Sequence, residues 1–148
     1  MHFTLSTAAN SGQASNTIYP NQLTITNAQE LKQAVQHDHV CGLFKNSQRS
    51  IVNFIKADCL VMDCDNDHSD DPTTWIKPAN IANYFDDVSY AITFSRNNMK
   101  AKHHKAPRPK FHVYFPITEI TDAKTYAELK HEIQEYFPYF DDNALDAA

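Results

Sequence analysis

The chain has 148 residues, of which 42% are hydrophobic, and this composition suits a single folded domain and excludes a disordered chain. Its apolar runs are too short to cross a membrane, and its N-terminus lacks a secretory signal, so we expect a cytoplasmic protein whose three cysteines are reduced. The net charge of −5 disfavours a general nucleic-acid binder, and a total of two glycines excludes the glycine-rich phosphate loops of Walker-type and dinucleotide-binding proteins.

The first half of the chain predicts short strands and one helix. The predicted strands cover residues 2–6, 41–45, 50–54 and 58–63. Residues 7–22 are polar and rich in turn formers. A cap-like sequence at residues 26–30 predicts a helix that begins at Thr26 or Asn27 and ends near His37. The last of the strands is a nearly continuous apolar run, which is typical of a strand buried on both faces.

The second half predicts two further helices and two strands. These are a helix at residues 78–85, strands at 90–94 and 110–116, and a long helix at 122–137. Pro78 suits a first helical turn, where its missing N–H is not needed. The long helix has one apolar face, formed by Tyr126, Leu129, Ile133 and Phe137. No closing element follows it, so we interpret residues 1–148 as one domain at the N-terminal end of a longer protein.

An Asp-x-Asp pair, Asp63 and Asp65, follows the apolar strand directly. Residues two apart on an extended segment point to the same side, so both carboxylates can reach one cation. Oxygen ligands of this kind suit Mg²⁺ or Mn²⁺, which bridge protein carboxylates and substrate phosphates. The alternative is an acidic turn that closes the strand. An EF-hand is excluded, because His68 stands where that loop requires glycine and no Glu follows five residues later.

A basic segment runs from residue 96 to residue 110. It holds six basic residues and no acid, whereas the rest of the chain has seven basic and eighteen acidic residues. Lys110 and His112 share one face of the strand at 110–116, and with Arg108 they indicate a phosphate-facing group; the alternative is a structural histidine. Ser95, at the end of the preceding strand, is assigned to the same nucleotide-binding group. The loop itself predicts either a solvated surface or a contact with a nucleic-acid backbone. The cations assigned to that contact are Arg96, Lys100, Lys102 and Lys105.

Three motifs in this order resemble the archaeo-eukaryotic primase superfamily, especially the primase–polymerase modules of phages, prophages, plasmids and other mobile elements. The motifs are Val61-Met62-Asp63-Cys64-Asp65, then Lys110-Phe111-His112, then Phe140-Asp141. The resemblance implies that Asp63, Asp65 and Asp141 hold catalytic metal ions and that His112 contacts the phosphates of the nucleotide. Lys110 stands where the family has Ser. The third aspartate is assigned to Asp141 rather than Asp142 only because an apolar residue precedes it.

The resemblance also implies a fold and an activity. The fold is α/β (α+β), a two-layer palm with an RNA-recognition-like sheet beside an N-terminal α/β module. The activity is two-metal nucleotidyl transfer with Mg²⁺ or Mn²⁺, as in a DNA primase or DNA polymerase that acts in DNA replication of a mobile element. Its partners are nucleoside triphosphates and a DNA template or primer, and such modules are often fused to a helicase.

Two other functions are compatible with the same residues. A haloacid-dehalogenase-like phosphatase also has an apolar strand that ends in Asp-x-Asp, and it would use Asp63 as the nucleophile and Ser95 as a phosphate contact. In that family, however, Thr or Val is preferred where this chain has Asp67, and the motif lies close to the start of the chain. The second alternative is a non-catalytic replication module that binds DNA through residues 96–110.

Overall fold

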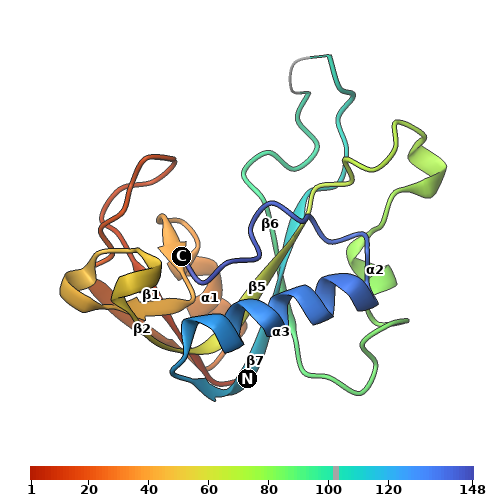
Figure 1. Cartoon of the computed structure of the whole chain (residues 1–148). Helices are drawn as coiled ribbons and strands as arrows, with labels where there is room; N and C mark the ends of the chain where they lie inside the picture. The colour runs from red at the N-terminus through yellow and green to blue at the C-terminus, as the bar shows by residue number, and fades with distance from the viewer. Residues whose placement is uncertain (102–103) are drawn as a thin grey trace.

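The computed structural model describes residues 1–101 and 104–148, and this part of the chain forms two antiparallel sheets and three α-helices (Figure 1). The first sheet has the order β2-β1-β3, with β1 at Phe3–Thr7, β2 at Asn21–Ile25 and β3 at His39–Val40. The second has the order β4-β5-β7-β6, with β4 at Gly42–Phe44, β5 at Phe54–Cys64, β6 at Ala91–Phe94 and β7 at Phe111–Ile120. The helices are α1 (Ala28–Ala34), α2 (Pro78–Ile81) and α3 (Ala123–Tyr136). Within the described ranges, no helix is long and apolar enough to cross a membrane.

The second sheet has a split β-α-β arrangement. β7 is antiparallel to both β5 and β6, so β5 and β6 run parallel to each other with β7 between them. The connection from β5 to β6 contains α2, and α3 follows β7. This order of β5, α2, β6, β7 and α3 is that of the first five elements of a ferredoxin-like unit. The mixed α/β class expected from the sequence is therefore confirmed.

Both faces of the central strands β5 and β7 are covered. Leu60, Met62 and Val113 are buried in the core that contains the apolar face of α3. Cys59 and Tyr114 belong to a second core, formed with the N-terminal sheet and α1. Because successive residues of a strand point to opposite faces, the two cores divide each strand by alternate residues. The apolar run at residues 58–63 predicted a strand buried on both faces, and the two cores account for the burial of each face.

Polar caps fix the starts of the two longer helices. The side chain of Asn27 accepts hydrogen bonds from the backbone N–H groups of Gln29 and Glu30, both at 3.0 Å. The side chain of Asp122 accepts one from the backbone N–H of Thr125 at 2.8 Å. Each cap satisfies donors that have no partner inside the helix. Both predicted helix starts are thus confirmed.

Three local predictions were wrong. The strand predicted at residues 50–54 is a 3₁₀ turn at Ile51–Asn53, and β5 begins only at Phe54. The helix predicted at 78–85 ends at Ile81 as α2. β2 begins within residues 7–22, which were predicted to be turns. It was not predicted as a strand because four of its five residues are exposed, and it forms a strand through its pairing with β1. An exposed edge strand lacks the hydrophobic alternation on which strand prediction depends.

Candidate metal and nucleotide site

The Asp-x-Asp pair and the histidine motif lie opposite each other on β5 and β7. The register pairs Asp63 with His112 and Cys64 with Phe111, which places Asp65 opposite Lys110. Asp63 Oδ1 lies 3.5 Å from His112 Nε2, and Asp65 Oδ2 lies 2.7 Å from Lys110 Nζ. Residues two apart share one face of a sheet, so each carboxylate faces a basic side chain of the neighbouring strand. The structure thus brings together two motifs that are far apart in the sequence.

Asp141 completes a group of three acidic residues at this end of β5. Its backbone N–H donates to the backbone C=O of Asp63 at 2.8 Å, and the preceding Phe140 is buried in the α3 core. Burial, followed by the negative charges of Asp65 and Asp63, raises the pKa of the Asp141 carboxyl to about 7. Asp142 is exposed to solvent. Of the two candidates for the third aspartate, Asp141 is therefore the one beside the Asp-x-Asp pair.

The chemistry of these carboxylates fits Mg²⁺ or Mn²⁺. A half-buried Asp141 beside two other carboxylates lies in an unfavourable negative potential, and a bound cation would relieve it. Within residues 1–101 and 104–148, no three His, Cys, Asp or Glu side chains already form a metal-binding group. The side chains of Asp63, Asp65 and Asp141 would have to turn toward a shared ion to coordinate it together.

A cavity of about 220 Å³ opens beside Asp63 and His112. Its lining also includes Arg49 and Lys130, two cations that the sequence did not indicate as functional. Lys130 is only 5% exposed, and burial lowers its pKa. Its ammonium donates to the backbone C=O of Ala144. The cavity is therefore lined by two acidic side chains, Asp63 and Asp146, and by two basic side chains from other parts of the chain.

One of these cations had a sequence signal that was missed. Lys130 lies four residues after Tyr126 on α3, next to the predicted apolar face, and a charged residue at such a position is exceptional in an amphipathic helix. Arg49 has no comparable signal, because it follows a short 3₁₀ turn whose place in the fold depends on tertiary contacts.

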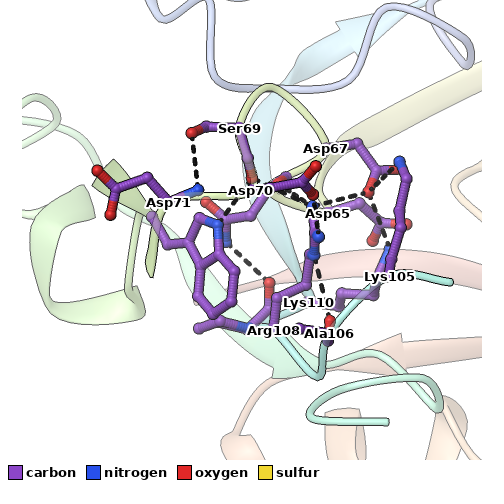
Figure 2. Close-up of polar contacts among 12 residues, drawn as sticks. Asp65, Asp67, Ser69, Asp70, Asp71, Lys105, Ala106, Arg108 and Lys110 are labelled. Carbon is purple, nitrogen blue, oxygen red and sulfur yellow. Dashed lines mark hydrogen bonds and ion pairs between the residues drawn. The ribbon is translucent and has the colours of Figure 1, made fainter. Parts of the chain in front are cut away.

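Arg108 has a structural role that differs from the predicted phosphate contact. Its side chain is 1% exposed and donates to the backbone C=O of Asn66 at 2.9 Å and of Ser69 at 3.2 Å (Figure 2). It also pairs with Asp70 at 2.7 Å and lies 5.2 Å from the centre of the Trp75 ring. With its guanidinium engaged in these contacts, Arg108 holds the loop that follows β5 and does not present its charge to a ligand.

The rest of the basic segment is partly neutralised by acidic residues from elsewhere in the chain. Arg96 pairs with Asp38 at 2.6 Å, and Lys105 pairs with Asp67 at 3.1 Å. The positive charge that is segregated in the sequence is therefore not segregated in space. About half of the Arg96 and Lys105 side chains nevertheless remain exposed, so both can still contact a polyanion.

Three further predicted contacts have simpler surroundings. Ser95 lies in the turn after β6, and its hydroxyl accepts a hydrogen bond from the backbone N–H of Asn97 at 3.3 Å. Lys100 is exposed. Lys102 lies outside the described residues.

Comparisons with protein-family models, with curated proteins and with solved structures found no match to this chain. The interpretation of the site therefore depends on its geometry and on the order of its motifs.

Proposed function

We propose that this chain is a primase–polymerase module that performs metal-dependent nucleotidyl transfer from nucleoside triphosphates to a DNA strand. The observation that carries the proposal is the meeting of Asp63, Asp65 and Asp141, with His112 on the adjacent strand. These residues come from three separate segments, and a simple acidic turn would not require the third aspartate or the histidine.

The topology supports a palm of the RNA-recognition type. β4 pairs with β5 only as far as Ala57, and at the far end of β5 the backbone of Asp141 hydrogen-bonds to Asp63. The segment after α3 therefore borders the end of β5 that carries the acidic pair. In a β-α-β-β-α-β unit, the last strand follows the second helix in the same way.

Each side chain has a role in the proposed reaction. Asp63, Asp65 and Asp141 would hold a divalent cation, whose positive charge would favour ionisation of the attacking hydroxyl and neutralise the phosphates. His112 can donate a hydrogen bond to a phosphate oxygen from the wall of the cavity. Arg49 lines the same cavity, is exposed, and provides charge for the rest of the triphosphate.

The basic loop supplies the proposed contact with template or primer. Exposed cations such as Lys100, Lys105 and Arg96 bind a phosphate backbone without regard to sequence. A helicase, as a fused domain or a separate partner, fits this function in the replication of a mobile element.

Nucleotide binding tests the proposal before any assay of turnover. We would titrate a deoxynucleoside triphosphate into the chain by calorimetry, with and without Mn²⁺. The test variant is Asp63→Asn/Asp65→Asn. The matched control is Asp86→Asn/Asp87→Asn, which removes the same charge from an exposed pair of aspartates. We expect metal-dependent binding by the wild type and the control, and no binding by the test variant.

Other outcomes favour the two alternatives. Unchanged DNA binding by the test variant, without metal-dependent nucleotide binding by the wild type, supports a non-catalytic DNA-binding module. A phosphorylated Asp63 after incubation with a phosphate ester supports the phosphatase. Either result contradicts the proposed nucleotidyl transfer.

A further inference from the structure

Lys110 occupies a fixed position within the acidic site. Its side chain is 9% exposed, and its ammonium lies 2.7 Å from Asp65 Oδ2 and 3.8 Å from Asp67 Oδ1 (Figure 2). Its backbone is held on both sides: the N–H donates to Asn98 Oδ1 at 3.0 Å, and the C=O accepts from the N–H of Ser95 at 2.9 Å. The hydrogen-bonded backbone of Lys110 therefore fixes the position from which its ammonium contacts Asp65.

This position limits how many metal ions Asp65 can share. Oδ2 of Asp65 already accepts a charge-assisted hydrogen bond, and a divalent ion at the same oxygen would face the ammonium at short range. Moving the ammonium away would leave a largely buried charge without its partner, which is strongly unfavourable. Its second acidic neighbour, Asp67, is farther away at 3.8 Å and shares the same oxygen with Lys105 at 3.1 Å.

We infer that the site takes one divalent cation and that the ammonium of Lys110 replaces the second. The single ion would be held by Asp63 and Asp141 with the remaining oxygen of Asp65, on the side away from Lys110. An ammonium has three N–H donors, so Lys110 can neutralise Asp65 and still donate to an oxygen of the substrate. This inference rests on the proposed function and changes the two-metal arrangement implied by the family resemblance, in which Ser occupies the position of Lys110.

The competing explanation is an ion pair that opens when metal binds. In that case Lys110 only fills the space in the absence of ions, and two divalent ions displace it. The two explanations predict different numbers of bound metal ions, and this number can be measured without any turnover.

The experiment counts Mn²⁺ per bound nucleotide by equilibrium dialysis with a non-hydrolysable deoxynucleoside triphosphate, corrected for Mn²⁺ carried by free nucleotide. The test variant is Lys110→Ser, which removes the ammonium and leaves room for a hydrated ion. The matched control is Lys105→Ser, which removes a half-exposed lysine from the pair with Asp67. We expect one Mn²⁺ in the wild type, one in the control and two in Lys110→Ser.

A count of two in the wild type overturns the inference while leaving the proposed function intact, and it does so even if Lys110→Ser does not fold. A count of one in a folded Lys110→Ser variant also overturns it, because the ammonium then does not exclude a second ion. If the wild type binds no Mn²⁺ with nucleotide, the proposed function itself fails, and the inference fails with it.

Discussion

The two faces of the β5–β7 ribbon have opposite characters. On the face toward α3, residues such as Leu60, Met62 and Phe111 are fully buried and apolar. On the other face, the N-terminal sheet covers Cys59, but the end of the ribbon carries Asp63 and its partners beside an open cavity. One pair of strands therefore has a buried apolar face and a face that ends in the charged residues of the candidate site, and substitutions on the two faces should separate stability from ligand binding.

The largest effect on stability is expected from the face toward α3. Phe137 is fully buried and contacts the rings of Tyr84, Phe85 and Phe140. Phe137→Ala should lower the free energy of unfolding by about 3–5 kcal/mol, because the cavity that it leaves cannot collapse completely. Urea denaturation measures this loss. The neighbouring Tyr136 is 62% exposed, and Tyr136→Ala should cost less than about 1 kcal/mol. Equal losses in both variants would show that Phe137 is not packed in the core beneath α3.

A smaller loss is expected at Arg108, which is charged but structural. Arg108→Met would leave the buried backbone C=O of Asn66 without its Arg108 donor, at a cost of about 1–3 kcal/mol, whereas the C=O of Ser69 keeps the hydrogen bond from Trp75. Metal-dependent nucleotide affinity should not change. Lys105→Met is the control, since its half-exposed pair with Asp67 should contribute less than about 1 kcal/mol. If Arg108→Met has normal stability but binds nucleotide more weakly, the result would support the phosphate contact that the sequence predicts for Arg108.

The opposite pattern is expected at His112 on the charged face. His112→Gln should reduce nucleotide affinity about tenfold, the equivalent of one hydrogen bond to a charged group. Its free energy of unfolding should change by less than about 1 kcal/mol, because the ring is partly exposed and lies outside both apolar cores. Calorimetric titration and urea denaturation give the two quantities. His131→Gln, at an exposed position of α3, should change neither. If His112→Gln unfolds the protein but leaves affinity intact, the histidine is structural.

The last effect concerns pH. The pKa of Asp141 is raised to about 7 in the folded chain from an ordinary value of 3.8, so the folded state keeps a proton that the unfolded state has lost. The protonated carboxyl of Asp141 contributes to the free energy of unfolding fully below about pH 4, and this contribution is lost as the pH rises toward 7. Asp141→Asn removes this dependence and should raise the melting temperature by a few degrees at pH 8 in EDTA, but not at pH 4.

Asp142→Asn provides the control for this measurement, because Asp142 is exposed. The measurement compares the melting temperatures of wild type, Asp141→Asn and Asp142→Asn at pH 4 and pH 8, and only Asp141→Asn at pH 8 should differ from the wild type. A melting temperature for Asp141→Asn that follows the wild type at both pH values would show that the folded chain does not raise the pKa of Asp141.

The sequence by itself determined the features that depend on local periodicity. The apolar run at 58–63 lies within β5, and the apolar face formed by Tyr126, Leu129, Ile133 and Phe137 at helical spacing predicted α3. The placement of Asp63 and Asp65 on one side of an extended segment also follows from local geometry alone. β2 escaped prediction because its exposed residues carry no apolar pattern.

Only the tertiary structure decided which distant residues meet. Lys110 pairs with Asp65 across 45 residues of sequence, and Asp141 lies beside Asp63 because the segment after α3 returns to the end of β5. Neither the burial of Arg108 nor the cation of Arg49 at the cavity could be predicted from neighbouring residues. Strand register is selected by the burial of whole faces against the two cores, and a shift of β7 by one residue would turn His112 away from Asp63 to the other face of the sheet.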